Sequence, residues 1–111
     1  MFNLRSRFFI AELEDSYQVF EINDELERFQ KIEVEDEPLY KILNPSSIFV
    51  FIDSGNKKVW LWNGRHSGIR KKFIASQSVQ KVRDKFCLDY HIVTVDDGRE
   101  DLEFKILVGI D

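Results

Sequence analysis

The strongest pattern along the chain is an apolar run at residues 48–52, followed by polar turn residues and a second apolar run at residues 59–62. An unbroken run of β-branched and aromatic residues is typical of a strand whose two faces are both covered. Gly55 and Asn56, between the two runs, both accept positive φ, which tight turns require. The pattern therefore predicts a hairpin whose first strand is the central strand of a sheet.

Residues 68–88 contain no proline and no internal glycine, and their apolar positions recur at helical spacing. We expect a helix of about five turns, with each residue rotated by about 100° from the one before. One stripe of this helix is predicted to pack on the sheet, with Ala75, Val79, Val82 and Phe86 at its centre and Ile69, Phe73 and Cys87 at its flanks. The opposite face is predicted to be exposed and largely basic, with Arg70, Ile74, Gln77, Ser78, Lys81 and Lys85.

The remaining segments predict further strands and turns. Alternating or apolar β-rich stretches favour strands at residues 7–13, 17–22, 29–34 and 90–95. Residues 39–43 lie between Pro38 and Pro45, which fits a short helical turn or an irregular crossing, and we interpret them as a loop. Residues 100–110 fit both a strand and a helix. Together these elements predict an α+β domain.

Length and composition restrict the class of protein. A chain of 111 residues with 43% apolar content predicts a single domain, residues 1–111, with a full core. No apolar run approaches the roughly 18 residues of a membrane span, and the N-terminus lacks a secretory apolar region. Cys87 is the only cysteine, so no internal disulfide forms. A cytoplasmic location is expected.

The net charge of −4 hides a division of charge along the chain. Residues 12–37 contain eleven acids and two bases, whereas residues 57–85 contain nine bases and one acid. One interpretation is a solvated surface whose two halves attract each other. The other is a basic helix directed at an acidic partner.

Several of these segments, taken in order, resemble the gelsolin repeat. The matching phrases are residues 42–56 (ILNPSSIFVFIDSGN), 59–64 (VWLWNG), 75–77 (ASQ), 82–84 (VRD), 90–98 (YHIVTVDDG) and 102–109 (LEFKILVG). The resemblance covers residues 17–110 and leaves the first predicted strand as an addition to the repeat or a variation of it. It implies a five- or six-stranded mixed sheet between one long helix, at about residues 68–88, and one short helix or C-terminal element.

The resemblance also implies a partner, actin or an actin-like protein. In the family the long helix commonly rests in a cleft between two actin subdomains. The face that matches here carries Arg70, Ile74, Gln77, Ser78, Lys81 and Lys85, with Ile74 as the candidate apolar anchor. A single repeat favours monomer sequestration, side binding or capping over severing.

The calcium site usual in the family is predicted to be absent. Ser46, Ser47 and Lys71 occupy the positions where the family places a Gly-Asp pair and a helix Glu. Calcium needs several oxygen ligands, preferably charged ones, and an ammonium cannot supply one. Lys71 either replaces the ion by holding the helix to the strand end or is simply solvated. No cofactor is expected.

Other functions remain as alternatives. Lys57, Lys58, Arg65, Lys71 and Lys72 are candidates for binding anionic phospholipid such as phosphoinositide. A structural role in assembly without actin is a further alternative, and the edge of the first strand offers a route to a weak homodimer. Nucleic-acid binding is disfavoured by the acidic chain, and enzyme activity by the lack of a phosphate-binding glycine loop or zinc spacing.

Overall fold

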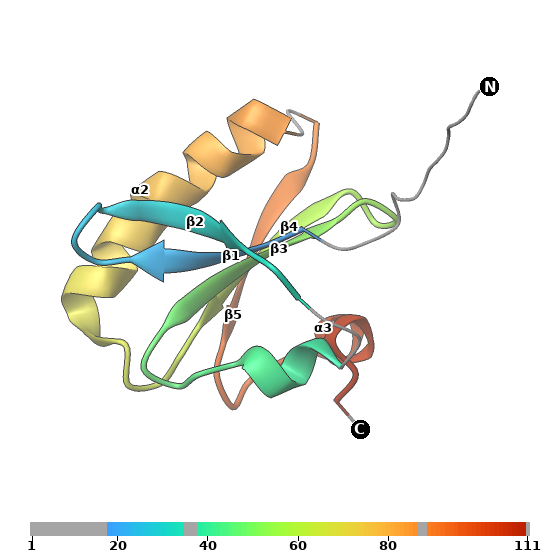
Figure 1. Ribbon diagram of the computed structural model, residues 1–111. Coiled ribbons are helices and arrows are strands. Elements are labelled where there is room, and N and C mark those ends of the chain that lie inside the picture. Colours follow the sequence, from blue (N-terminus) through green and yellow to red (C-terminus); the bar gives the residue numbers. More distant parts are fainter. Residues whose placement is uncertain (1–17, 35–37, 87–88, 111) are drawn as a thin grey trace.

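The computed structural model describes residues 18–34, 38–86 and 89–110. These residues form a five-stranded sheet with a long helix on one face and two short helices on the other (Figure 1). The elements in chain order are β1 (Gln18–Asn23), β2 (Arg28–Ile32), the 3₁₀ helix η2 (Leu39–Ile42), β3 (Ile48–Asp53), β4 (Lys58–Asn63), α2 (Gly68–Phe86), β5 (His91–Asp96) and α3 (Leu102–Val108). The predicted α+β sandwich is therefore confirmed.

The sheet has the strand order β2-β1-β3-β4-β5. Neighbouring strands are antiparallel, except for the parallel pair β4 and β5, which α2 connects. The predicted hairpin is confirmed, with Asp53 opposite Lys58 at its turn. All six residues of β3 are buried, as expected for the central strand.

The three smaller elements predicted from the sequence have different outcomes. The segment interpreted as a loop forms η2, so that prediction was wrong; a short 3₁₀ turn fits between two prolines without further extension. The ambiguous C-terminal segment is the helix α3. The Asp101 side chain accepts a hydrogen bond from the Phe104 N–H at 2.9 Å, and Gly109 ends the helix with a φ of 87°. The strand predicted at residues 7–13 lies outside the described residues.

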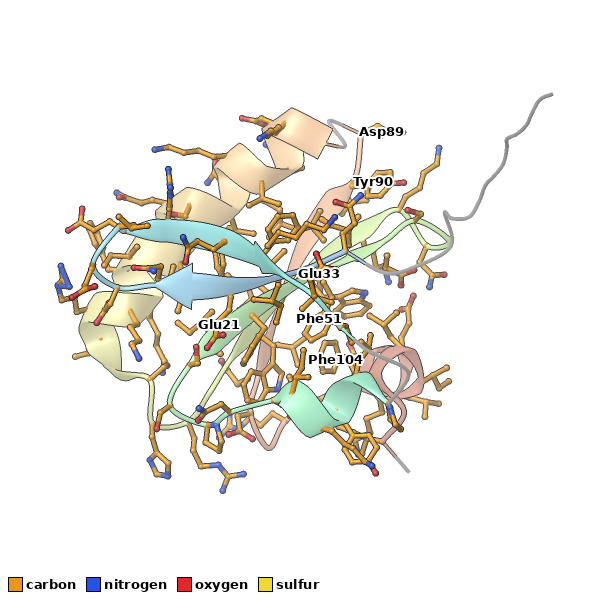
Figure 2. All side chains as sticks on the ribbon, viewed as in Figure 1. Glu21, Glu33, Phe51, Asp89, Tyr90 and Phe104 are labelled. Atoms are coloured by element: carbon orange, nitrogen blue, oxygen red, sulfur yellow. The ribbon has the colours of Figure 1, made fainter. Side chains whose placement is uncertain are left out.

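The core consists of two apolar layers, one on each face of the sheet. α2 covers the first layer with Ala75, Val79 and Val82. The second layer is mainly aromatic and contains Phe49, Phe51, Trp60, Trp62 and Phe104. The rings of Phe51 and Phe104 meet edge to face, with centroids 5.6 Å apart, and fix α3 on the sheet (Figure 2).

The loop after β4 passes close to the segment before β3. The Gly64 N–H donates to the Ser47 carbonyl at 3.0 Å. A Cβ atom on Gly64 would lie 2.3 Å from the Pro45 carbonyl oxygen and 2.5 Å from that of Ser47. Only glycine therefore fits at this position, which explains the glycine that follows Trp62 and Asn63.

Across the described residues, no helix is long and apolar enough to cross a membrane.

Replacing Gly64 with alanine should destabilise the fold because the two loops must move apart. We expect the free energy of unfolding to fall by about 1–3 kcal/mol, measured by urea denaturation. Gly55→Ala is the matched control, since a Cβ there meets only the Asp53 carboxylate, at 3.7 Å. Equal denaturation midpoints for the two variants would show that the close approach imposes no constraint.

Candidate functional site

The outer face of α2 is the candidate functional site, but the helix is rotated relative to the prediction. Ile74 and Ser78, which we expected to be exposed, are only 8% and 5% exposed. Ile69 and Phe73, expected to flank the buried stripe, are 87% and 63% exposed. The predictions that Ile74 and Ser78 are exposed and that Ile69 and Phe73 flank the buried stripe were therefore wrong.

The rotation follows from how α2 approaches the edge of the sheet near β2. The Ser78 hydroxyl donates to the Glu27 carbonyl, in the turn between β1 and β2, at 3.2 Å. Ser78 and Ala75 are small, which lets this part of the helix approach the sheet closely. Ile74 then joins the apolar layer beneath α2, together with Val79 and Val82. Hydrophobic periodicity cannot reveal this rotation, because Phe73 and Ile74 are both apolar.

Ile69 and Phe73 are one helical turn apart, so they lie on the same side of α2. Both are large and exposed, and neither belongs to a core cluster of the described residues. The spacing of four residues is the signal that could have identified them as a pair. Two large exposed apolar side chains on one side of a helix mark a candidate contact for another protein.

A cavity of about 360 Å³ lies beside Phe73, between α2 and the turn that joins β1 to β2. Its lining is mixed in character and consists of Glu27, Arg70, Phe73, Ile74, Gln77, Ser78 and Lys81. Arg70 spans the rim of this cavity and pairs with Glu27 at 3.1 Å. The predicted residues Arg70, Gln77, Lys81 and Lys85 are exposed, as expected.

The positions that match the calcium site of the gelsolin repeat contain hydrogen-bonded groups. The Lys71 ammonium donates to the Ser46 carbonyl oxygen at 2.8 Å. The Ser47 hydroxyl donates to a Glu21 carboxylate oxygen, also at 2.8 Å. The positive charge of Lys71 thus lies against the Ser46 carbonyl oxygen, just before β3, and this hydrogen bond joins α2 to the loop before β3. Among the described residues, no group of three or more His, Cys, Asp or Glu side chains has the arrangement of a metal site.

The residues proposed for lipid binding do not form one patch. Lys57 and Lys58 lie at the β3–β4 turn, where they pair with Asp89 and Glu103. Arg65 lies just beyond the opposite end of β4. At the usual rise per strand residue, this places it about 20 Å from Lys57 and Lys58.

Arg65 forms an ion pair with Asp97, with Arg65 Nε 3.1 Å from Asp97 Oδ2 and Arg65 Nη2 3.2 Å from Asp97 Oδ1. Hydrogen bonding to this guanidinium holds the pKa of the Asp97 carboxyl below its usual range, and the same pair raises the pKa of Arg65. Arg65 therefore secures the loop before α2 to the turn after β5. Of the lipid-binding candidates, Lys72 alone has no hydrogen bond or ion pair with a described residue.

No family model matches the sequence, and no curated protein matches it. The structure is similar to that of ProGel from Thorarchaeota, solved as a complex with rabbit actin. The TM-score is 0.72 at 22% sequence identity, and the match covers 85% of this chain and 100% of that chain.

It is also similar to 2DGel3 from Thorarchaeota, likewise solved as a complex with rabbit actin. That match has a TM-score of 0.61 at 17% identity and covers 79% of this chain, but only 43% of the 2DGel3 chain. At these identities the similarity concerns the arrangement of the elements. The chain therefore has the gelsolin-like fold that its sequence motifs predict.

Proposed function

We propose that this protein binds actin or an actin-like protein through the outer face of α2. The observation that carries the proposal is the exposed pair Ile69 and Phe73, one turn apart on the long helix of a gelsolin-like fold. Two proteins with this fold, ProGel and 2DGel3, were solved as complexes with rabbit actin. Their complexes support actin as the partner class.

The proposed contact is a helix in a groove. Ile69 and Phe73 supply the apolar centre, and Arg70, Gln77 and Lys81 supply a polar rim. A few well-packed side chains near the centre of such an interface contribute most of the binding free energy. A helix contact of this kind suits monomer sequestration, side binding or capping.

We further propose that binding is independent of calcium at the site usual in the gelsolin repeat. The Lys71 ammonium occupies the position of an acidic ligand and bonds to the Ser46 carbonyl oxygen. Its positive charge would repel a calcium ion there. The contact between α2 and the loop before β3 then needs no metal.

Phe73→Asp should weaken actin binding by about tenfold to a hundredfold, since it places a charge at the centre of the contact. The measurement is inhibition of pyrene-actin polymerisation, with co-sedimentation to obtain the affinity. Leu102→Asp is the matched control, because Leu102 is 72% exposed but lies on α3, on the opposite face of the sheet. Equal affinities for the two variants would exclude this face of α2 as the actin contact.

Ile74→Ala should lower the stability of the fold rather than the affinity for actin, because Ile74 is 8% exposed and belongs to the core. We expect a loss of about 2–4 kcal/mol in the free energy of unfolding, measured by chemical denaturation. Under conditions where this variant is fully folded, its affinity for actin should stay near that of the unsubstituted protein. A large loss of affinity without any loss of stability would restore Ile74 as the anchor.

Ser47→Asp combined with Lys71→Glu should create calcium binding, because the pair supplies two carboxylates where the chain now has a hydroxyl and an ammonium. Isothermal titration calorimetry with calcium is expected to give a binding signal for the double variant and none for the unsubstituted protein. Actin binding by the unsubstituted protein should be equal in calcium and in chelator. A calcium-dependent affinity would contradict the proposed independence.

A further inference from the structure

The turn between β1 and β2 lies against the part of α2 between Arg70 and Ser78 (Figure 1). In addition to the bond from the Ser78 hydroxyl to the Glu27 carbonyl, Arg70 Nη2 lies 3.1 Å from Glu27 Oε2. Arg70 Nη1 lies 3.6 Å from Asp24 Oδ1. Two residues of α2, about two helical turns apart, therefore hold this turn beside the outer face of the helix.

Two residues of this turn are not of the types that tight turns favour. Leu26 lies where Gly, Asn, Asp and Ser are common. Glu27 has a φ of 54°, in the left-handed region that residues other than glycine seldom adopt. Such a conformation persists where the surrounding contacts fix it, and it often coincides with a functional site. The bonds from α2 to the carbonyl and to the carboxylate of Glu27 supply those contacts.

Hydrogen bonds within the hairpin fix the position of Leu26 as well. Its N–H donates to Asn23 Oδ1 at 2.9 Å, and Asn23 Nδ2 donates to Gln30 Oε1 at 2.8 Å. The Asn23 side chain thus links the turn to β2. A turn that is already fixed loses little conformational entropy when it binds a partner.

Exposed large apolar side chains occur in two places among the described residues. Three of them belong to η2 and α3. The other three are Ile69 and Phe73 on α2, and Leu26 in the turn beside it. Leu26 is 50% exposed and belongs to neither core cluster of the described residues. A single exposed leucine is ordinary, but a group of exposed apolar side chains marks a contact surface.

The cavity of about 360 Å³ lies between the two elements that carry this second group. Glu27 lines it from the turn, and Phe73 lines it from α2. Leu26 is the neighbour of Glu27 in the chain. Both elements that border the cavity therefore carry an exposed apolar side chain, and a partner that covers both elements can place a side chain of its own between them.

The charge of the turn favours a protein partner over an anionic membrane. Asp24, Glu25 and Glu27 are acidic, and residues 24–27 include no base. Anionic lipid attracts clusters of Lys and Arg and repels acids, so a membrane would not approach this turn closely. A protein surface can present apolar groups to Leu26 and acids to the basic residues further along α2.

We propose that the β1–β2 turn is a second contact element for actin or an actin-like protein, with Leu26 as its contact residue. This inference rests on the proposed function of α2, because the same partner has to cover Ile69 and Phe73. In the complex, Leu26 and Phe73 contact the partner from the two elements that border the cavity. Arg70 and Ser78 hold the turn in place from α2.

The test compares the actin affinities of Leu26→Asp, Phe73→Asp and Leu102→Asp in pyrene-actin and co-sedimentation assays. Leu26→Asp should weaken binding by about tenfold, since it places a charge in an apolar contact. Leu102→Asp is the same substitution on α3 and should leave the affinity unchanged. If Phe73→Asp weakens binding and Leu26→Asp does not, this inference is overturned and the proposed function stands. If neither weakens binding, the proposed function fails as well.

Cross-saturation from unlabelled actin to the leucine methyl groups tests the contact without any substitution. We expect strong intensity loss at Leu26 and little at Leu102, which is 72% exposed. Loss at Ile69 in the same sample, with none at Leu26, would limit the contact to α2 and overturn the role of the turn. Chemical denaturation should give Leu26→Asp a midpoint close to that of the unsubstituted protein, because Leu26 is outside the core clusters.

Discussion

Burial of β3 and β4 on both faces is the constraint on which the rest of the structure depends. Every residue of β3 is buried, and Val59, Trp60, Leu61 and Trp62 of β4 are buried as well. Two strands with no solvated face require one layer above and another below. α2 supplies the first layer, and η2 and α3 supply the second. The Gly64 contact with Ser47 then fixes the point where the chain leaves β4 for α2.

This constraint explains why the fold could be predicted from the sequence. The apolar run at residues 48–52 and the hairpin after it are strong local patterns, and their positions match β3 and β4 closely. The C-terminal helix is different, because apolar residues in that segment fit two periods. Its identity as a helix depends on the cap at Asp101 and on the contact between Phe51 and Phe104, which joins distant parts of the chain.

The candidate site shows where sequence reasoning fails. The long helix was predicted correctly, but its orientation about its own axis was not. The bond from Ser78 to the Glu27 carbonyl and the small side chain of Ala75 turn α2 so that Ile74 faces the sheet. Helical periodicity defines a stripe only to within about one residue position, or about 100°. Ile69 and Phe73 are therefore exposed, and they, rather than Ile74, form the apolar centre of the candidate site.

We have proposed that the outer face of α2 is the actin contact. The most direct measurement is cross-saturation from unlabelled actin to the isoleucine methyl groups of this protein in the complex. We expect strong intensity loss at Ile69 and little at Ile106, which is 70% exposed but lies on α3. Loss at Ile106 with none at Ile69 would contradict it, and so would a complete absence of loss under conditions where actin is bound.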